Sequence, residues 1–218
     1  MRPLSLEQLN GLNIEISSAC TARCPFCSRQ QKIRPYGQHL ISLAEFKLLP
    51  DRFISRLKWI NFGGDFGDLC TNAALPEIIA HVRALNPDAV IGGDTNAASQ
   101  DETWWSRLGQ GFGKGAMTFC IDGLADTHAL HRVGTSFQKV LRNLKAFTEG
   151  GGTAYWKFIV FKHNQHQIEA AAELAEQAGC RRFFAISSRD YDASLEKPEG
   201  FAFSVKRDLF RASVTDET

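Results

Sequence analysis

Three cysteines crowd into one short stretch near the start of the chain. Cys20, Cys24 and Cys27 are separated by three and two residues, and the stretch follows a β-rich run. Three thiolates at this spacing can converge on one site, and thiolates bind iron–sulfur clusters and zinc. A structural zinc site needs a fourth ligand, but His39, the closest downstream histidine, stands at no familiar spacing. The three cysteines therefore favour a cubane cluster with one iron left open, where a substrate or cofactor can bind.

Further polar and glycine-rich stretches follow three other β-rich runs. They are Gly63-Gly64-Asp65 with Asp68, then Thr95-Asn96, and then Cys120 and Asp122 with Arg132. A carboxylate suits a bound ammonium group, a guanidinium group suits a bound carboxylate, and glycines let the backbone come close to a ligand. Taken alone, these stretches also fit plainer interpretations: a glycine-rich turn with a helix-capping aspartate, an Asx turn and a surface arginine.

The chain alternates between β-rich and helical segments. Strands are expected at 12–17, 58–62, 89–92, 117–121, 154–161 and 182–186. Between them, residues 42–45 form a capping box, Pro76 suits a first helical turn, and residues 135–138 cap a helix that stops at the glycines 150–152. A further helix is expected over 165–178, with Asn164 as its N-cap.

Strand, helix and strand at this spacing indicate parallel βα units. About six such units can form a doubly wound sheet or a partial barrel, and both folds bind ligands at the carboxyl ends of the strands. The candidate residues follow strands, so we expect them to meet there. Strand alternation places Thr118, Cys120 and Asp122 on one face. The pattern ends near residue 190, and residues 191–218 are expected to form a short tail with one helix over 204–212.

The composition argues against several other classes. Hydrophobic residues make up 44% and charged residues 22%, as in ordinary soluble globular proteins. A net charge of +1 argues against a nucleic-acid partner. No apolar run is long enough for a signal peptide or a membrane span, so we expect a cytoplasmic protein without membrane contact. Cys70, Cys120 and Cys180 are scattered and do not indicate a disulfide framework.

The cysteine motif resembles that of the radical S-adenosylmethionine (SAM) superfamily, in which CxxxCxxC follows the first strand and an aromatic residue precedes the last cysteine. The resemblance implies an α/β fold, a partial TIM-like (β/α)6 barrel over residues 1–190. It also implies a [4Fe-4S] cluster on Cys20, Cys24 and Cys27, whose open iron chelates the amino and carboxylate groups of SAM. In that family one electron from the cluster splits the sulfonium bond. The products are methionine and a 5′-deoxyadenosyl radical, which abstracts a substrate hydrogen.

The first SAM-binding residues are also implied by this resemblance. Phe26 corresponds to the aromatic residue near the adenine. Gly63-Gly64-Asp65 resembles the GGE motif that meets the SAM amino group, with aspartate in place of glutamate. Gly67-Asp68 is a competing match, so the choice between Asp65 and Asp68 stays open.

The later stretches resemble further motifs of the same family. Thr95-Asn96 resembles the TNG motif after the third strand. Cys120, Asp122 and Arg132 fall in a stretch that resembles S-x-D-G…H…R-G, in which Arg132 is a candidate partner for the SAM carboxylate. Cys120 stands at the serine position and is the candidate catalytic residue, because some family members return a hydrogen atom from a thiol to the substrate radical. Cys70 is an alternative donor, and plain packing is the simpler interpretation of Cys120.

The fourth-strand pattern resembles family members that modify peptides and related substrates, which implies a peptide, protein or similar polar substrate. A nucleoside or small-molecule metabolite is the alternative substrate, and a non-catalytic iron–sulfur or zinc-binding protein is the alternative class. We expect a reductant such as flavodoxin or ferredoxin to supply the electron. Only Cys180 follows Cys120, so we expect no auxiliary-cluster domain. A large substrate or a partner protein is then expected to close the barrel.

Overall fold

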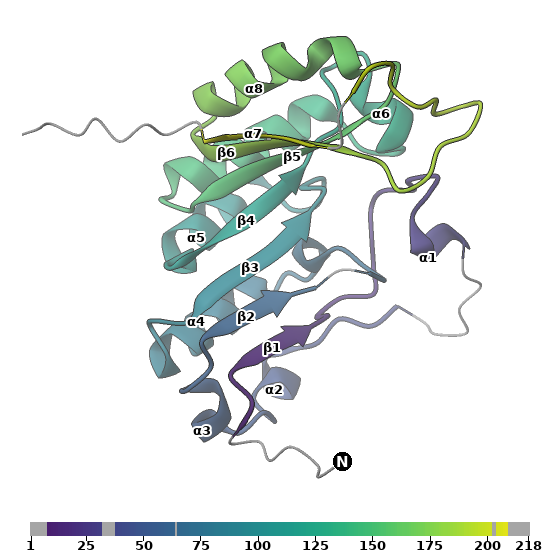
Figure 1. The fold of residues 1–218 in the computed structure, drawn as a ribbon. Coiled ribbons are helices and arrows are strands. Elements are labelled where there is room, and N and C mark those ends of the chain that lie inside the picture. Colours follow the sequence, from purple (N-terminus) through teal and green to yellow (C-terminus); the bar gives the residue numbers. More distant parts are fainter. Residues whose placement is uncertain (1–7, 32–37, 64, 202–203, 209–218) are drawn as a thin grey trace, which may run out of the picture.

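The computed structural model describes residues 8–31, 38–63, 65–201 and 204–208. One seven-stranded sheet runs through this part of the chain, with its strands side by side in chain order (Figure 1). The first six strands are parallel, as predicted. They are β1 (Gly11–Ile14), β2 (Trp59–Phe62), β3 (Val90–Thr95), β4 (Gly115–Cys120), β5 (Ala154–Val160) and β6 (Cys180–Ser187).

Helices connect the strands, and their ends follow local sequence signals. The α-helices are α1 (Ser28–Gln31), α2 (Leu43–Phe46), α3 (Asp51–Ile54), α4 (Leu75–Leu85), α5 (Glu102–Phe112), α6 (His128–His131), α7 (Phe137–Glu149) and α8 (Ile168–Gln177). Two short 3-10 helices are η2 (Leu69–Thr71) and η3 (Gln165–Gln167). The capping box is confirmed, because Ser42 accepts from the Glu45 amide and Glu45 accepts from the Ser42 amide.

Two predicted helix caps need correction. The N-cap of α7 is Ser136, whose hydroxyl accepts from the Lys139 amide, rather than Thr135. Asn164 makes no side-chain cap at η3. Its amide instead donates to the carbonyl oxygens of Asp122 and Ile159, both at 3.0 Å. Asn164 therefore ties the end of β5 to the loop after β4.

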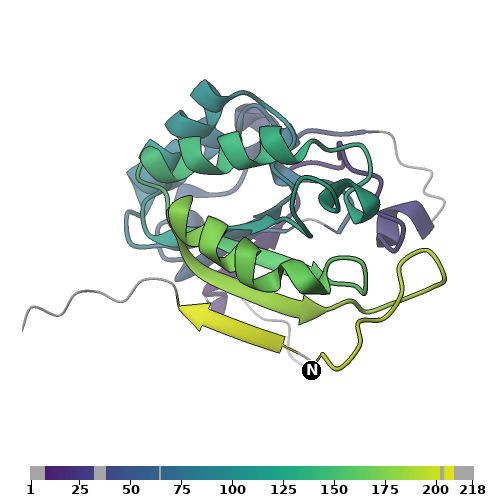
Figure 2. The same cartoon turned by 90° about the horizontal axis from the view of Figure 1, so that it is seen from above.

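One face of the sheet carries the core and the other faces open space. Side chains alternate along β5, so that Trp156 and Phe158 are fully buried while Lys157 and Ile159 are only partly covered. The buried face packs on the apolar stripes of the long helices, for instance through Trp105 of α5. Viewed from above, α7 and α8 lie on the same side of β6 and β7 (Figure 2). We call the other, partly exposed face of β1–β6 the inner face of the sheet.

The final strand corrects the expectation of a C-terminal helix. Residues Ser204–Asp208 form β7, which runs antiparallel to β6. The backbone groups along the free edge of β6 would otherwise lack partners, and pairing with β7 satisfies them. The rest of the expected helix, 209–212, lies outside the described residues. The division of the chain at residue 190 stays a prediction, although β7 extends the same sheet.

The loops that follow the strands gather at one end of the molecule. In Figure 1 the arrowheads of the parallel strands point toward the segment that carries α1. This is the end at which parallel α/β sheets bind ligands. No helix in the described ranges is long and apolar enough to cross a membrane.

Candidate functional site

A cavity of about 500 Å³ opens at the carboxyl ends of the strands. Its walls come from the loops after β1, β2 and β3, from the ends of β4 and β6, and from β5. Most predicted site residues line it, namely Cys20, Cys24, Phe26, Cys27, Asp65, Asp68, Thr95, Asn96, Cys120 and Arg132. Gly63 and Asp122 are absent from the lining, and Gly64 lies outside the described residues. The fold thus brings together side chains from positions 20 to 132 of the chain.

The loop that carries Cys20, Cys24 and Cys27, here called the cysteine loop, is held in place by backbone hydrogen bonds. Before the first cysteine, the Ile41 amide donates to the Ile16 carbonyl at 2.9 Å. Within the loop, the Arg23 amide donates to the Val133 carbonyl at 2.9 Å. The loop is therefore attached both to the segment before α2 and to the loop that carries Arg132.

Gly67 lets the loop after β2 lie directly against the cysteine loop. A Cβ atom at this position would stand 2.1 Å from the Ser17 carbonyl oxygen, which no side chain could tolerate. The next residue, Asp68, donates its amide to the Ala19 carbonyl at 2.7 Å. Glycine is required here by the close backbone approach.

The three thiols sit in a partly desolvated environment. Burial raises the pKa of Cys20 to about 11 and also raises the pKa of Cys24 above its ordinary value. Such thiols keep their protons at neutral pH unless a metal displaces them, because a bound metal deprotonates its thiol ligands. The thiols of Cys20 and Cys24 are therefore neutral at neutral pH, and a metal that binds them displaces their protons.

The same cysteines are not arranged around a single metal ion. Across the described ranges, no group of three or more histidine, cysteine, aspartate or glutamate side chains could hold one. Two sulfurs on one zinc ion are less than about 4.6 Å apart, since each Zn–S bond is about 2.3 Å long. In a cubane cluster each thiolate binds a different iron, so the sulfurs stand farther apart. Three cysteine side chains that line one cavity are the donor set that a cubane cluster with one open iron requires.

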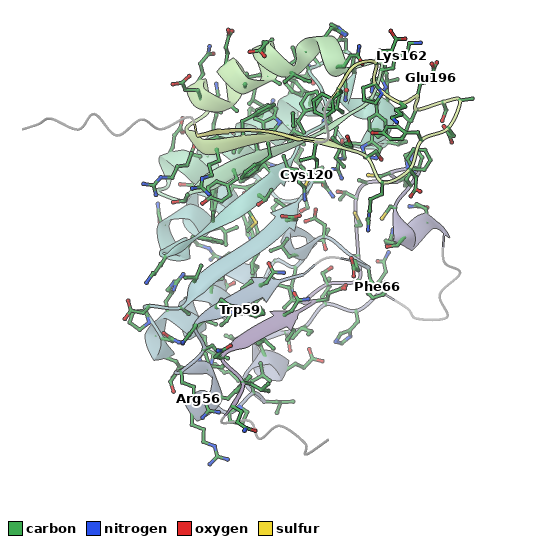
Figure 3. All side chains as sticks on the ribbon, viewed as in Figure 1. Arg56, Trp59, Phe66, Cys120, Lys162 and Glu196 are labelled. Carbon is green, nitrogen blue, oxygen red and sulfur yellow. The ribbon has the colours of Figure 1, made fainter. Side chains whose placement is uncertain are left out.

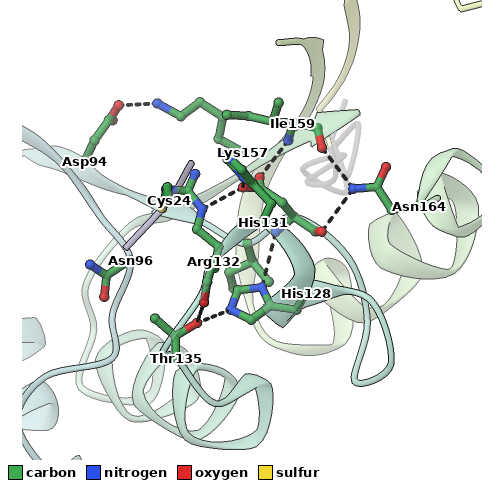
Figure 4. Close-up of polar contacts among 12 residues, drawn as sticks. Cys24, Asp94, Asn96, His128, His131, Arg132, Thr135, Lys157, Ile159 and Asn164 are labelled. Carbon is green, nitrogen blue, oxygen red and sulfur yellow. Dashed lines mark hydrogen bonds and ion pairs between the residues drawn. The ribbon is translucent and has the colours of Figure 1, made fainter. Parts of the chain in front are cut away.

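Two N–H donors from other loops point at the cysteine sulfurs. The Asn96 side-chain amide lies 3.4 Å from the Cys20 sulfur, and Nη1 of Arg132 lies 3.6 Å from the Cys24 sulfur. Figure 4 shows Arg132 extending to Cys24 with Asn96 nearby. Hydrogen bonds to cluster sulfurs are a main determinant of reduction potential. Asn96 and Arg132, both predicted to bind SAM, therefore also contact the cysteine loop.

The carboxylate of Asp68 is hydrogen-bonded to other parts of the protein. It is buried and accepts three hydrogen bonds. The donors are the backbone amide of Cys70 at 3.0 Å, the Thr95 hydroxyl at 2.8 Å and the backbone amide of Asn96 at 2.6 Å. Burial nevertheless raises its pKa above the ordinary value. Asp68 therefore joins the loop after β2 to the turn after β3 and holds Asn96 near Cys20.

Asp65 has its carboxylate exposed at the cavity. The side chain makes no hydrogen bond to any other described residue, while its backbone amide donates to Glu15 at 3.1 Å. Glu15 also accepts from the Phe66 amide at 3.0 Å and so fixes the turn. Of the two aspartates between which the sequence could not choose, Asp65 is the one with a carboxylate available to a ligand.

Asp122 lies behind the cavity wall and anchors Arg132. Its Oδ2 atom accepts from Nε of Arg132 at 2.6 Å and from Nδ1 of His131 at 2.7 Å. Its Oδ1 atom accepts from the Ile159 amide at 2.7 Å. Burial alone would raise the pKa of Asp122, but the Arg132 guanidinium and the His131 hydrogen bond hold it well below its ordinary value. Strand alternation stops at Cys120, where β4 ends, so it did not bring Asp122 to the inner face.

Cys120 faces the cavity at the end of β4, as predicted (labelled in Figure 3). Burial raises its pKa to about 12, so the side chain is a neutral thiol at neutral pH. Cys70, the alternative donor, is fully buried in the hydrophobic core and does not line the cavity. The alternation of β4 therefore identified the one cysteine outside the cysteine loop that lines this cavity among the described residues.

Several residues that line the cavity were not predicted from the sequence. Lys157, Asp94 and His131 line the same space, together with residues 187–190 at the end of β6. Lys157 interrupts an apolar strand, and its parity opposite the buried Trp156 and Phe158 could have placed it on the inner face. Glu15 and residues 187–190 carried no comparable signal.

Comparison with known proteins bears on this architecture. No family model and no curated protein sequence matches the chain. Solved structures do match, all at low sequence identity. Streptococcus suis SuiB bound to its precursor peptide SuiA aligns with a TM-score of 0.66 and 13% identity over 88% of this chain and 42% of SuiB.

Two further structures match equally broadly. The protein anSMEcpe, with bound AdoMet (SAM) and a Cp18Cys peptide, aligns with a TM-score of 0.63 and 18% identity over 90% of this chain and 55% of that protein. Methylornithine synthase (PylB) aligns with a TM-score of 0.57 and 12% identity over 88% of this chain and 55% of PylB. All three are radical SAM enzymes.

This chain has the radical SAM core fold. The predicted partial barrel is thereby confirmed as six parallel strands in one open sheet with helices. The chain spans between 39% and 56% of the length of the SuiB, anSMEcpe and PylB structures that it matches.

Proposed function

We propose that this protein is a radical SAM enzyme that binds a [4Fe-4S] cluster through Cys20, Cys24 and Cys27 and cleaves SAM reductively. One observation carries the proposal. The three cysteines of a CxxxCxxC motif line the same cavity as Asp65 and Arg132, at the carboxyl ends of parallel strands in a radical SAM core fold. Thiolates for the cluster and charged groups for the ligand of its open iron therefore share one space.

The protein holds the cluster with thiolates and with N–H donors. When bound, the cluster and SAM supply the chemistry: one electron breaks the sulfonium bond to give methionine and a 5′-deoxyadenosyl radical, which takes a hydrogen atom from the substrate. Asn96 and Arg132 donate to the sulfurs of Cys20 and Cys24 and stabilise negative charge there. A reductant such as flavodoxin or ferredoxin supplies the electron.

The amino-acid end of SAM binds between two opposite charges in this proposal. Asp65 receives the ammonium group, since its carboxylate has no other described partner. Arg132 receives the carboxylate through Nη2, which makes no hydrogen bond to any described residue. Phe26 lines the same cavity and packs against the adenine. The protein thereby orients the sulfonium toward the cluster and keeps bulk water away.

The substrate enters the inner face beside Cys120. We propose that it is a peptide, a protein side chain or a similar polar molecule. SuiB with its precursor peptide SuiA and anSMEcpe with a Cp18Cys peptide support this class, because their core domains share this fold. Cys120 supplies a hydrogen atom to the substrate radical, for which a thiol that keeps its proton is suited.

Reconstitution of the protein with iron and sulfide under anaerobic conditions tests the proposed function. In the presence of SAM and dithionite, we expect methionine and 5′-deoxyadenosine in equal amounts. A protein that takes up zinc and no iron, or an iron–sulfur protein that leaves SAM intact, would contradict the proposal.

A further inference from the structure

A pair of opposite charges lies on the wall of the cavity. Lys157 of β5 forms an ion pair with Asp94 of β3, and both residues line the cavity. Figure 4 shows the Lys157 side chain reaching across to the Asp94 carboxylate. The side chains are 24% and 54% exposed, respectively, so the pair faces the open space and not the core.

The fold itself has little need of this pair. Strands β3, β4 and β5 are already joined by backbone ladders, in which Asp94 neighbours Thr118 and Cys120 neighbours Lys157. A partly exposed ion pair adds little stability, because the ordering of two side chains and the loss of hydration offset the attraction. Apolar side chains would cover this wall with no such cost. A ligand explains the two charges better than packing does.

The pair also brackets the candidate hydrogen donor. Strand β4 lies between β3 and β5, so a molecule that contacts both Asp94 and Lys157 must cross β4. Cys120 is the last residue of β4 and faces the same cavity. A ligand held by the two charges therefore lies over the Cys120 thiol, on the side of the sheet where the cysteine loop closes the cavity.

We propose that Lys157 and Asp94 bind the amino-acid end of the substrate, with Lys157 on a carboxylate and Asp94 on an ammonium group. The substrate is then an α-amino acid whose charged groups lie next to the reacting carbon. On binding, each side chain exchanges its protein partner for the opposite charge on the ligand, so no charge is left unpaired. This inference selects a free amino acid, among the similar polar molecules proposed above, over a peptide or protein side chain, and it rests on the proposed function only for the location of the reaction.

The test measures binding rather than turnover. The reconstituted protein with SAM is titrated calorimetrically with each of the twenty proteinogenic amino acids. Every amino acid that binds is then compared with its N-acetyl derivative and its carboxamide. We expect each derivative to bind about ten- to a hundredfold more weakly, the effect of losing a hydrogen bond to a charged group. The paired variant Asp94→Asn with Lys157→Met removes both charges together, and we expect it to lose the same binding.

A matched control is the lysine just after β5 that pairs with two glutamates, Glu196 and Glu199. Lys162 pairs with Glu196 at 3.1 Å outside the cavity, so Lys162→Met with Glu196→Gln should leave amino-acid binding unchanged. The inference is overturned if no amino acid binds, if blocked forms bind as tightly as free ones, or if the uncharged pair binds like the wild type. If the double variant fails to fold, binding of the N-acetyl and carboxamide derivatives to the wild-type protein still tests the inference. SAM cleavage without any amino-acid binding would leave the proposed function standing and reject this inference alone.

Discussion

Nη1 of Arg132 lies 3.6 Å from the sulfur of Cys24, and it comes from a loop more than a hundred residues further along the chain. The guanidinium cannot drift from this position, because its Nε atom is held at 2.6 Å by the fully buried Asp122. His131 and the Ile159 amide complete the shell around Asp122. The buried carboxylate thus positions a cation against the cysteine loop.

This contact predicts a shift in the reduction potential of the cluster. Replacing Arg132 by methionine removes a positive charge and an N–H donor from the Cys24 sulfur, and both stabilise the reduced state. We expect the potential to become more negative by tens of millivolts in a redox titration followed by electron paramagnetic resonance. Arg142→Met is the matched control, because that arginine pairs with Glu102 on the surface. An unchanged potential in an intact Arg132→Met cluster would show that the contact does not act on the cluster.

Substitutions of the two aspartates after β2 should affect different properties: Asp65 should affect SAM binding and Asp68 should affect stability. Asp65→Asn should weaken SAM binding about ten- to a hundredfold, since it removes a charge-assisted hydrogen bond to the ammonium group. Asp68→Asn should mainly lower the free energy of unfolding, because Asp68 accepts three internal hydrogen bonds. Calorimetric titration with SAM and urea unfolding of the metal-free protein measure the two effects. Normal SAM binding by Asp65→Asn would reject the proposed contact.

His128 predicts how stability depends on pH. Burial lowers its pKa to about 4, from about 6.5 in an unfolded chain, and the nearby charges of Arg132 and His131 act in the same direction while Asp122 opposes them. The unfolded state therefore binds the extra proton between these values, and stability is lost as the pH falls from about 6.5 to about 4. At about 1.4 kcal/mol per pH unit, the loss is about 3 kcal/mol. Asp122 stays ionised in the folded protein across this window, and it adds to the loss of stability only near the lower end, where the carboxyl group of the unfolded chain begins to bind a proton.

Urea unfolding of the metal-free protein at several pH values measures this dependence. The His128→Asn variant keeps an acceptor near the Nδ1 position and should show a flatter profile than the wild type. The exposed His39 provides the control, and His39→Asn should keep the wild-type slope. Equal slopes in the wild type and the His128 variant would mean that this histidine is not the group that titrates.

The sequence predicted the six parallel strands because their apolar runs are short, regular and separated by clear helix signals. It also predicted which loops carry the site, since strand ends meet at one edge. It could not tell which of Asp65 and Asp68 has a carboxylate available to a ligand. Asp68 is unavailable because it accepts from the backbone amide of Asn96, which reaches Asp68 only in the folded chain. Asn164 has the residue type of a helix cap, but two carbonyl oxygens of the folded protein take its amide group instead.

Cys120 predicts the origin of one hydrogen atom in the product. A donor thiol exchanges its proton with solvent, so the wild type should transfer deuterium to the product in deuterated water. The Cys120→Ala variant should still form 5′-deoxyadenosine but lose this transfer. Cys180→Ala, a change in the buried core, is the control and should keep it. The same product with the same deuterium content from Cys120→Ala would mean that Cys120 only packs the wall of the cavity.

The most direct test is the iron and sulfide content of single cysteine variants after anaerobic reconstitution. We expect about four irons and four sulfides per wild-type chain. Each of Cys20→Ala, Cys24→Ala and Cys27→Ala should lose the cluster and, with it, SAM cleavage. Cys180→Ala should keep the full content. A variant of any of the three loop cysteines that retained a complete cluster and full SAM cleavage would contradict the account.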